Sequence, residues 1–184
     1  AMVTLHSLLS PGDLDDLADS AAGAPPGAIV EVGVYHGGSA QRLAAVAAAQ
    51  GRALWLFDTF AGHPHADPTR DDLREHPVGR FRDAIDPEEL QALLPHAHIV
   101  VGVFPDTLQG LSLPPIAFVH GDADLYDVTR AICTQLPPRM VPGGRLYFDD
   151  YSHVGTEGCR LAVDEVFGPA PPLPNGKRLV ELPW

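Results

Sequence analysis

The stretch AIVEVGVYHGGSAQRLAAVAAAQG, residues 28–51, decides the fold of this chain. It opens with an apolar, β-branched run of the length of a buried strand, and its alanine-rich second half is typical of a helix. Gly33, Gly37 and Gly38 separate the two halves, and Gly51 stands where a helix C-cap is expected. The stretch therefore predicts a strand, a glycine turn and a helix in direct succession.

The same alternation of strand and helix continues towards the C-terminus. Short apolar strands are predicted at residues 53–58, 98–103, 115–122 and 143–150, and helices at residues 87–95, 105–111, 126–136 and 156–167. An Asn-Gly turn signal at residues 175–176 predicts an antiparallel hairpin at one edge. Strands that alternate with helices indicate an α/β fold, in which helices cover both faces of a mostly parallel sheet.

The length of 184 residues fits a single domain spanning residues 1–184. An amphipathic helix is predicted within residues 1–27. Residues 59–79, TFAGHPHADPTRDDLREHPVG, then interrupt the alternation with a long polar segment rich in His and Pro. Because long connections in compact domains tend to be functional or disordered, we expect a lid on the substrate side rather than a passive loop.

The composition excludes several classes of partner. A formal net charge of -12, with no cluster of Lys and Arg, argues against binding to nucleic acid. No apolar run approaches the length of a membrane span, and the N-terminal residues lack the layout of a signal peptide, so we expect a cytoplasmic protein that does not enter a membrane. Cys133 and Cys159 lie in helical patterns and are expected to be buried thiols rather than a disulfide.

Polar residues at the predicted strand ends are the candidates for a binding site, because ligands of open parallel sheets bind beyond the carboxyl ends of the strands. The glycine turn lets backbone approach a ligand, and helix amides after Ser39 can face an anionic group, although the same glycines also suit a simple tight turn. Asp58 ends the second strand, where an acidic residue can bind both hydroxyls of a ribose. Phe60 either covers the adenine of such a ligand or belongs to the core.

Two groups of aspartates follow later strands. HGDADLYD, residues 120–127, contains Asp122, Asp124 and Asp127, and FDDY contains Asp149 and Asp150. If the two strands are neighbours, carboxylates converge from both strand ends and suit Mg²⁺ or a similar hard cation. Solvated strand-end acids remain the alternative, and Asp127 is expected near the positive end of the following helix.

Five motifs together resemble the macrocin O-methyltransferase family of metal-dependent enzymes that use S-adenosylmethionine to methylate sugar hydroxyls of natural products. They are VEVGVYHGGSA (30–40), LFDTFAGHP (56–64), VVGVFPDTL (100–108), FVHGDADLYDVTRA (118–131) and LPPRMVPGGRLYFDDYSHVGTEGCRLAVDEVF (136–167). The resemblance implies a Rossmann-like class I methyltransferase fold, an O-methyltransferase activity, S-adenosylmethionine and Mg²⁺ as cofactors, and a small hydroxylated acceptor, a sugar or glycosylated natural product.

The resemblance also implies roles for individual residues. By motif, Glu31, Gly33, Gly37, Gly38 and Ser39 would surround the methionine part of the cofactor, and Asp58 would hold the ribose. Tyr35, Thr59, Phe60, Gly102 and Asp122 are further residues that we predict to bind the cofactor. The metal ligands would be Asp122, Asp149 and Asp150. Asp124 and Tyr126 also match the pattern, Asp124 to orient substrate or support the ligands and Tyr126 to pack the following helix.

O-methylation needs a group that accepts the proton of the acceptor hydroxyl. Asp122, His63, His120 and His153 are the candidates, with His65 a further histidine on the same side, and for each single histidine a structural or solvent-exposed role is the alternative. His36, in the glycine turn, is expected to contact the cofactor or the helix. We also expect a homodimer, the default of this class.

Two other functions are consistent with part of the sequence. An Asp-x-Asp pair also serves metal-dependent glycosyltransferases, but a glycine turn before the first helix and an Asp-Asp pair two elements later disfavour that reading. The other alternative is a non-catalytic cofactor-binding domain used for interactions. Members of the family usually carry a longer region before the first strand than the 27 residues here, so the acceptor stays open and residues 61–79 are expected to cover it instead.

Overall fold

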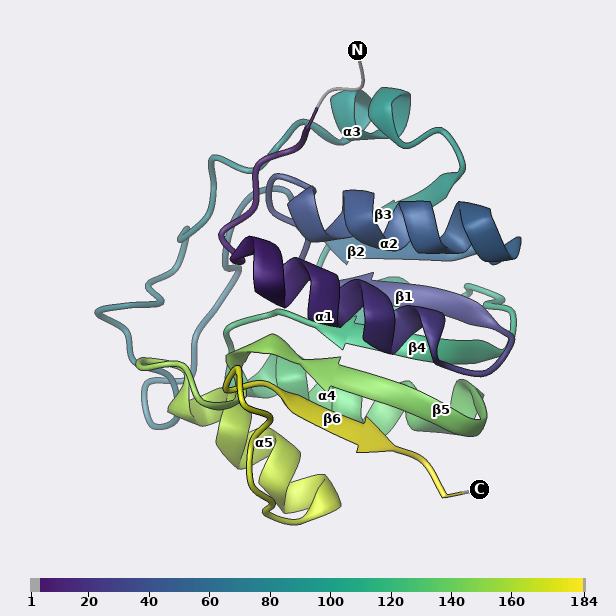
Figure 1. Ribbon diagram of the computed structural model, residues 1–184. Helices are drawn as coiled ribbons and strands as arrows, with labels where there is room; N and C mark the ends of the chain where they lie inside the picture. Colours follow the sequence, from purple (N-terminus) through teal and green to yellow (C-terminus); the bar gives the residue numbers. More distant parts are fainter. Residues whose placement is uncertain (1–3, 184) are drawn as a thin grey trace.

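The computed structural model describes residues 4–183 and contains one six-stranded sheet (Figure 1). The strands lie in the order β3-β2-β1-β4-β5-β6, and all neighbours are parallel except β5 and β6. Their bounds are β1 Ala28–Val32, β2 Leu54–Asp58, β3 Ala97–Val101, β4 Ile116–Gly121, β5 Met140–Phe148 and β6 Arg178–Glu181. The helices are α1 Pro11–Ala22, α2 Gly38–Gln50, α3 Pro87–Leu93, α4 Tyr126–Gln135 and α5 Glu157–Phe167, with short 3₁₀ turns at Asp106–Leu108, Pro137–Arg139 and Asp149–Tyr151.

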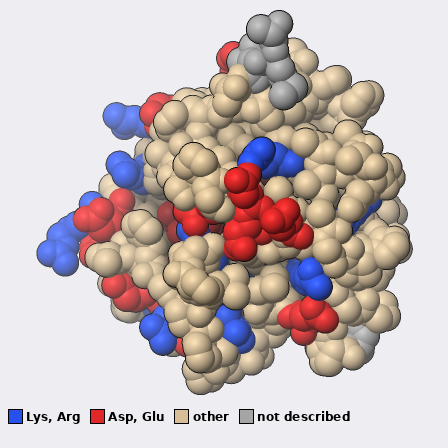
Figure 2. Space-filling model, viewed as in Figure 1, with Lys and Arg blue, Asp and Glu red and all other residues tan. Residues whose placement is uncertain are grey.

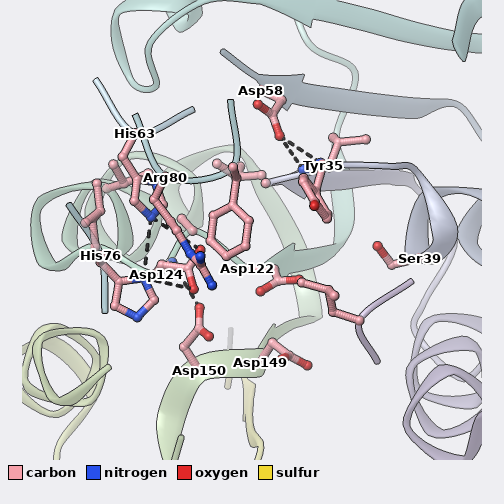
Figure 3. Close-up of a pocket in the computed structure, with 18 of the residues that line it drawn as sticks. Tyr35, Ser39, Asp58, His63, His76, Arg80, Asp122, Asp124, Asp149 and Asp150 are labelled. Atoms are coloured by element: carbon pink, nitrogen blue, oxygen red, sulfur yellow. Dashed lines mark hydrogen bonds and ion pairs between the residues drawn. The ribbon is translucent and has the colours of Figure 1, made fainter. Parts of the chain in front are cut away.

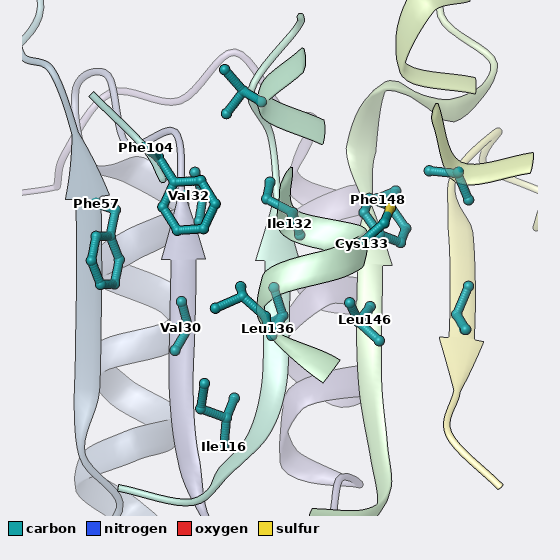
Figure 4. Close-up of a cluster of buried hydrophobic side chains, with 14 of the residues drawn as sticks. Val30, Val32, Phe57, Phe104, Ile116, Ile132, Cys133, Leu136, Leu146 and Phe148 are labelled. Atoms are coloured by element: carbon teal, nitrogen blue, oxygen red, sulfur yellow. The ribbon is translucent and has the colours of Figure 1, made fainter. Parts of the chain in front are cut away.

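The sheet separates two apolar layers, because successive side chains of a strand point to opposite faces. Val30 and Val32 of β1 belong to the layer formed with α4 and α5, whose centre is drawn in Figure 4. Ile29 of the same strand belongs to the layer formed with α1, α2 and α3. Helices therefore cover both faces, as the alternation of strands and helices predicts.

Local signals in the sequence account for the helix ends. The hydroxyl of Ser10 accepts from the backbone N–H of Asp13 at 3.1 Å and caps α1. The Asp86 carboxylate accepts from the N–H groups of Glu88 and Glu89 and caps α3. Gly51 ends α2 in the left-handed conformation, at φ 64°, as expected for a C-cap glycine.

Three details refine the sequence-based expectations. The helix expected at 105–111 is only the 3₁₀ turn Asp106–Leu108. The expected antiparallel pair forms at the sheet edge, but the partner of β6 is β5, which precedes it in the sequence by the whole of α5. The ladder runs from Arg145 opposite Glu181 to Phe148 opposite Arg178. Residues 59–86 are described throughout and contain neither helix nor strand.

The predicted single domain includes residues 1–3 and 184, which lie outside the described part of the chain. Within residues 4–183, no helix combines the length and the apolar character needed to cross a membrane. Figure 2 shows acidic side chains gathered over α1, in keeping with the net charge of -12.

Candidate cofactor and metal site

A pocket of about 510 Å³ lies at the carboxyl ends of the central strands, beside the point where the strand order reverses between β1 and β4. Its size is in the usual range for small-molecule sites. The predicted residues that line it are Gly33, Tyr35, Gly38, Ser39, Asp58, Thr59, His63, Gly102, Asp122, Asp149, Asp150 and His153. The structure thus brings most of the predicted site residues to one cavity (Figure 3).

The glycine turn holds β1 and β4 close together at the floor of the pocket. Gly33 has φ 92°, and a Cβ atom added to it would lie 1.7 Å from the backbone oxygen of Asp122. A Cβ on Gly38 would lie 2.4 Å from the Cβ of Ser7. Both glycines are therefore required because other parts of the chain pass close to them. This is a structural role, which the sequence allowed as an alternative to ligand binding.

Asp58 ties the end of β2 to the glycine turn. Its Oδ2 accepts from the backbone N–H of Val34 at 2.6 Å and of Tyr35 at 3.0 Å, and its Oδ1 accepts from Phe60 N–H at 2.7 Å. Each carboxylate oxygen has two lone pairs, so the side chain keeps acceptor capacity towards the pocket that it lines. Asp58 thus shapes the turn and faces the cavity as well.

Three carboxylates meet at the neighbouring ends of β4 and β5. Gly121 lies opposite Phe148 in the parallel ladder, which brings Asp122 next to the pair Asp149 and Asp150. One oxygen of each carboxylate lies within 4.8 Å of the others. Asp122, Asp149 and Asp150 together are called the carboxylate cluster below.

Burial makes the carboxylate cluster electrostatically costly. Desolvation, together with the charges of Asp149 and Asp150, raises the pKa of Asp122 well above its usual range. Desolvation and the charge of Asp149 raise the pKa of Asp150 to about 6. The Oδ1 of Asp149 is buried and has no hydrogen-bond partner among the described residues. An oxygen-only donor set with an unpartnered oxygen fits a hard divalent cation.

A second group of potential ligands lies on the same pocket wall. The Nε2 of His63 is 3.5 Å from the Nδ1 of His76, and the Asp124 carboxylate is 3.8 Å from the former and 3.6 Å from the latter. The backbone N–H of Asp124 donates to Asp150 Oδ2 at 3.0 Å, so this group adjoins the carboxylate cluster (Figure 3).

The other candidate histidines have different surroundings. His120 is fully buried and does not line the pocket; its Nδ1 lies 2.8 Å from Glu31 Oε1 on the neighbouring strand. His153 lines the pocket and is exposed, and its Nδ1 donates to the carbonyl oxygen of Val154 at 3.0 Å. His65 is half-exposed, with its Nε2 3.8 Å from Asp127 Oδ2.

Three predicted cofactor residues lie away from the pocket wall. Glu31 points into the sheet-helix layer and pairs with His120, because its side chain alternates to the α1 and α2 face of β1. Phe60 packs against the core formed with those helices. Gly37 caps α2 at φ 83°, and a Cβ there would meet Leu90.

Several residues that shape the site were not predicted from the sequence. Lys177, just before β6, places its Nζ 2.7 Å from Asp149 Oδ2. Asp71, from the segment expected to be a lid, accepts from the Tyr126 N–H at 2.8 Å at the start of α4. Residues 6–10 also line the pocket. The polar, histidine-rich composition of residues 59–79 indicated that this segment could reach the site. It did not identify Asp71 or His76 individually.

Sequence comparison agrees with this geometry. A sequence model of the macrocin O-methyltransferase (TylF) family matches residues 14–168. The chain belongs to this family. It is 34% identical over 158 residues to the 8-demethyl-8-(2,3-dimethoxy-alpha-L-rhamnosyl)-tetracenomycin-C 4'-O-methyltransferase of Streptomyces olivaceus, an alignment that covers 78% of this chain and 59% of that protein.

Two further relatives are similar over comparable lengths. The Mycinamicin III 3''-O-methyltransferase of Micromonospora griseorubida is 29% identical over 160 residues, which cover 76% of this chain and 60% of that protein. The crystal structure of the calicheamicin methyltransferase CalS11 superposes with a TM-score of 0.74 at 24% identity, over 94% of this chain and 77% of the other. The chain thus has a Rossmann-like class I methyltransferase fold. It spans about 60% of the length of the Streptomyces and Micromonospora enzymes.

Proposed function

We propose that the chain is an S-adenosylmethionine- and divalent-cation-dependent O-methyltransferase that acts on a sugar hydroxyl of a small molecule. The observation that carries the proposal is the carboxylate cluster, which shares one pocket with the glycine turn and Asp58. Neither a glycosyltransferase nor a non-catalytic module explains why a member of the macrocin O-methyltransferase family has the carboxylate cluster, the glycine turn and Asp58 around one pocket.

The cofactor would lie over the ends of β1 and β2. Gly33 and Ser39 line this part of the pocket, and the N-terminal end of α2 at Ser39 favours a carboxylate group. Three of the four lone-pair sites of the Asp58 carboxylate are occupied by backbone N–H groups, and the remaining one, on Oδ1, suits a ribose hydroxyl. Tyr35, Thr59 and Gly102 line the remaining wall and stay predictions as contacts.

Asp122, Asp149 and Asp150 would hold the cation, with Mg²⁺ the best match to three carboxylate oxygens. A bound Mg²⁺ lowers the pKa of an alcohol and orients it. The chain itself positions the ends of these strands: the backbone N–H of Asp122 donates to Val32 O at 2.9 Å, and that of Asp124 donates to Asp150 Oδ2 at 3.0 Å.

We propose His153 as the residue that accepts the proton of the acceptor hydroxyl. A carbonyl oxygen only accepts hydrogen bonds, so the contact with Val154 O keeps a proton on Nδ1 of His153. The Nε2 atom is then free to accept the proton of the acceptor hydroxyl. Its exposure allows the proton to leave to solvent. His120 lies in the core beside Glu31 and is better suited to positioning than to contact with an acceptor.

The acceptor class rests on the relatives. Two of them are named for methylation at sugar positions, 4' and 3''. Residues 6–10 and part of the segment after Asp58 line the pocket, and the lid that would enclose an acceptor there stays a prediction. Cytoplasmic location and a homodimer stay predictions, and sedimentation of the purified chain tests the latter.

Ligand-induced thermal stabilisation tests the proposal directly. S-adenosylhomocysteine with Mg²⁺ should raise Tm, because a ligand that binds only the folded state stabilises it, whereas UDP with Mg²⁺ should leave Tm unchanged. Methyl transfer from labelled S-adenosylmethionine is then measured with a panel of hydroxylated sugars and catechol-like diols, with and without chelator. Stabilisation by UDP but not by S-adenosylhomocysteine would refute the proposed cofactor.

A further inference from the structure

We propose that His63, His76 and Asp124 form a second cation site, selective for a borderline transition metal such as Zn²⁺ and distinct from the carboxylate cluster. These three residues are called the His-His-Asp site below. Two imidazoles and one carboxylate are a common donor set for zinc and related metals, whereas magnesium favours oxygen donors. The pocket would then contain two cation sites of different chemical preference.

The spacing of the three groups is the first argument. The Nε2 of His63 and the Nδ1 of His76 are 3.5 Å apart, and they lie 3.8 and 3.6 Å from different oxygens of the Asp124 carboxylate, distances that are long for hydrogen bonds. Ligands on one tetrahedral zinc, at about 2.0–2.1 Å from the metal, lie about 3.3–3.4 Å from each other. One ligand atom from each residue lies within 4.8 Å of the others, so the three groups must contract to reach one ion. Figure 3 shows the side chains directed towards a common point.

Burial is the second argument. The side chains of His63 and His76 are 10% and 9% exposed, and both nitrogens that face Asp124 lack a closer partner among the described residues. Buried imidazole nitrogens that face a carboxylate without a closer partner can bind a metal ion.

The surrounding charges favour a cation on balance. The carboxylates of Asp150, Asp149 and Asp58 act on Asp124 through their charges. The guanidinium of Arg80 is the positive group that faces both Asp124 and His63. Lys177 compensates Asp149, and the carboxylates of Asp58 and Asp150 still outnumber the Arg80 guanidinium, which leaves a negative potential that attracts a divalent ion.

The position of the site suggests what the ion does. His63 and His76 belong to the long segment after β2, and Asp124 lies between β4 and α4. The segment is already fastened to the same place by Asp71, which accepts from Tyr126 N–H at 2.8 Å. A bound ion would cross-link residues 63–76 to the end of the sheet, and would so fix the outer wall of the pocket.

Cobalt(II) is a suitable probe, because its visible absorption reports low-coordinate ligation by nitrogen. The metal-free full chain is titrated with Co²⁺ in the presence of excess Mg²⁺, which occupies oxygen-only sites. We expect one equivalent of Co²⁺ with strong visible bands, and His76→Gln should weaken this binding by at least about tenfold. His65→Gln, a histidine of the same segment outside the site, and Asp149→Asn should keep the bands.

Two readouts keep the test independent of activity and of variant folding. X-ray absorption of the wild-type chain with one equivalent of Zn²⁺ should show two imidazole ligands, and hydrogen exchange of residues 63–76 should slow when Zn²⁺ is added. Bands that survive His76→Gln but vanish in Asp149→Asn would overturn the proposal. So would oxygen-only ligation of Zn²⁺ in the wild-type chain, or no binding of Co²⁺ by it.

Discussion

The Nζ of Lys177 lies 2.7 Å from Oδ2 of Asp149, and both side chains are about nine-tenths buried. The lysine precedes the antiparallel β6, and the aspartate follows β5, so the pairing of these two strands brings an ammonium group to the carboxylate cluster. One carboxylate of the cluster is thereby compensated by the chain itself, while its Oδ1 stays without a partner among residues 4–183.

Replacing Lys177 by methionine should destabilise the metal-free protein and strengthen its binding of Mg²⁺. Loss of one partner leaves a buried charge unpaired, at a cost of about 3 kcal/mol in the free energy of unfolding. The positive charge that competes with Mg²⁺ is removed at the same time. Denaturant unfolding in chelator and the Mg²⁺-induced shift in Tm measure the two effects.

The matched control for this change is Arg74→Met. It removes the same charge from a side chain that is 90% exposed, where an ion pair with Asp72 contributes little. If Lys177→Met and Arg74→Met have the same stability and the same response to Mg²⁺, the pair with Asp149 has no influence on the cluster.

Gly33→Ala should destabilise the fold by about 3 kcal/mol or more, since the added Cβ would be 1.7 Å from the backbone oxygen of Asp122 at a residue with φ 92°. Gly51→Ala provides the comparison. Gly51 also has a positive φ of 64°, but nothing lies within 4 Å of its added Cβ, so only the backbone strain of about 1 kcal/mol remains. Equal losses in urea unfolding would show that the close approach of β1 and β4 is not maintained.

The fold was predictable because its signals are local. Short, continuous apolar runs such as the one before Gly33 indicate strands that are buried on both faces of a sheet. The alanine-rich helix after Gly33 is equally clear from its composition. The helix expected at 105–111 was too long because Gln109 adopts an extended conformation, at φ -66° and ψ 125°, directly before Gly110 at φ 76°. The partner of β6 was not predictable, since a turn signal does not specify which distant strand completes the ladder.

The site was predictable only where its residues end strands. Asp58, Asp122 and Asp149 follow apolar runs, so the parallel sheet alone brings them to one edge. Lys177 and His76 reach the pocket through the tail and the long segment, whose course depends on tertiary contacts. The pairing of Glu31 with His120 depends on strand order, which periodicity does not reveal.

Asp58→Asn should weaken binding of S-adenosylhomocysteine by about tenfold to a hundredfold, by analogy with the loss of a supporting group at a preorganised site. The amide replaces one acceptor by a donor, which then opposes the N–H groups of Val34, Tyr35 or Phe60. Calorimetric titration gives the affinity, and Asp106→Asn, an exposed aspartate outside the pocket, is the control. Unchanged affinity in Asp58→Asn would remove Asp58 from the cofactor site.

Both cysteines should be unreactive in the folded protein. Burial raises the pKa of Cys133 to about 12 and that of Cys159 well above its usual range, so nearly all of each thiol is protonated at pH 8. Reaction with a disulfide reagent should be slow at pH 8, become faster as the pH rises, and reach two thiols per chain after denaturation. Rapid reaction of one thiol in the native protein would show that its burial is wrong.

Calorimetric titration of Mg²⁺ into the chain saturated with S-adenosylhomocysteine tests the central claim most directly. The account predicts one Mg²⁺ per chain, with affinity at least about tenfold lower in Asp149→Asn and unchanged in Asp127→Asn, whose half-exposed side chain lies outside the cluster. Absence of Mg²⁺ binding to the wild-type chain, or equal affinity in the wild type and Asp149→Asn, would contradict it.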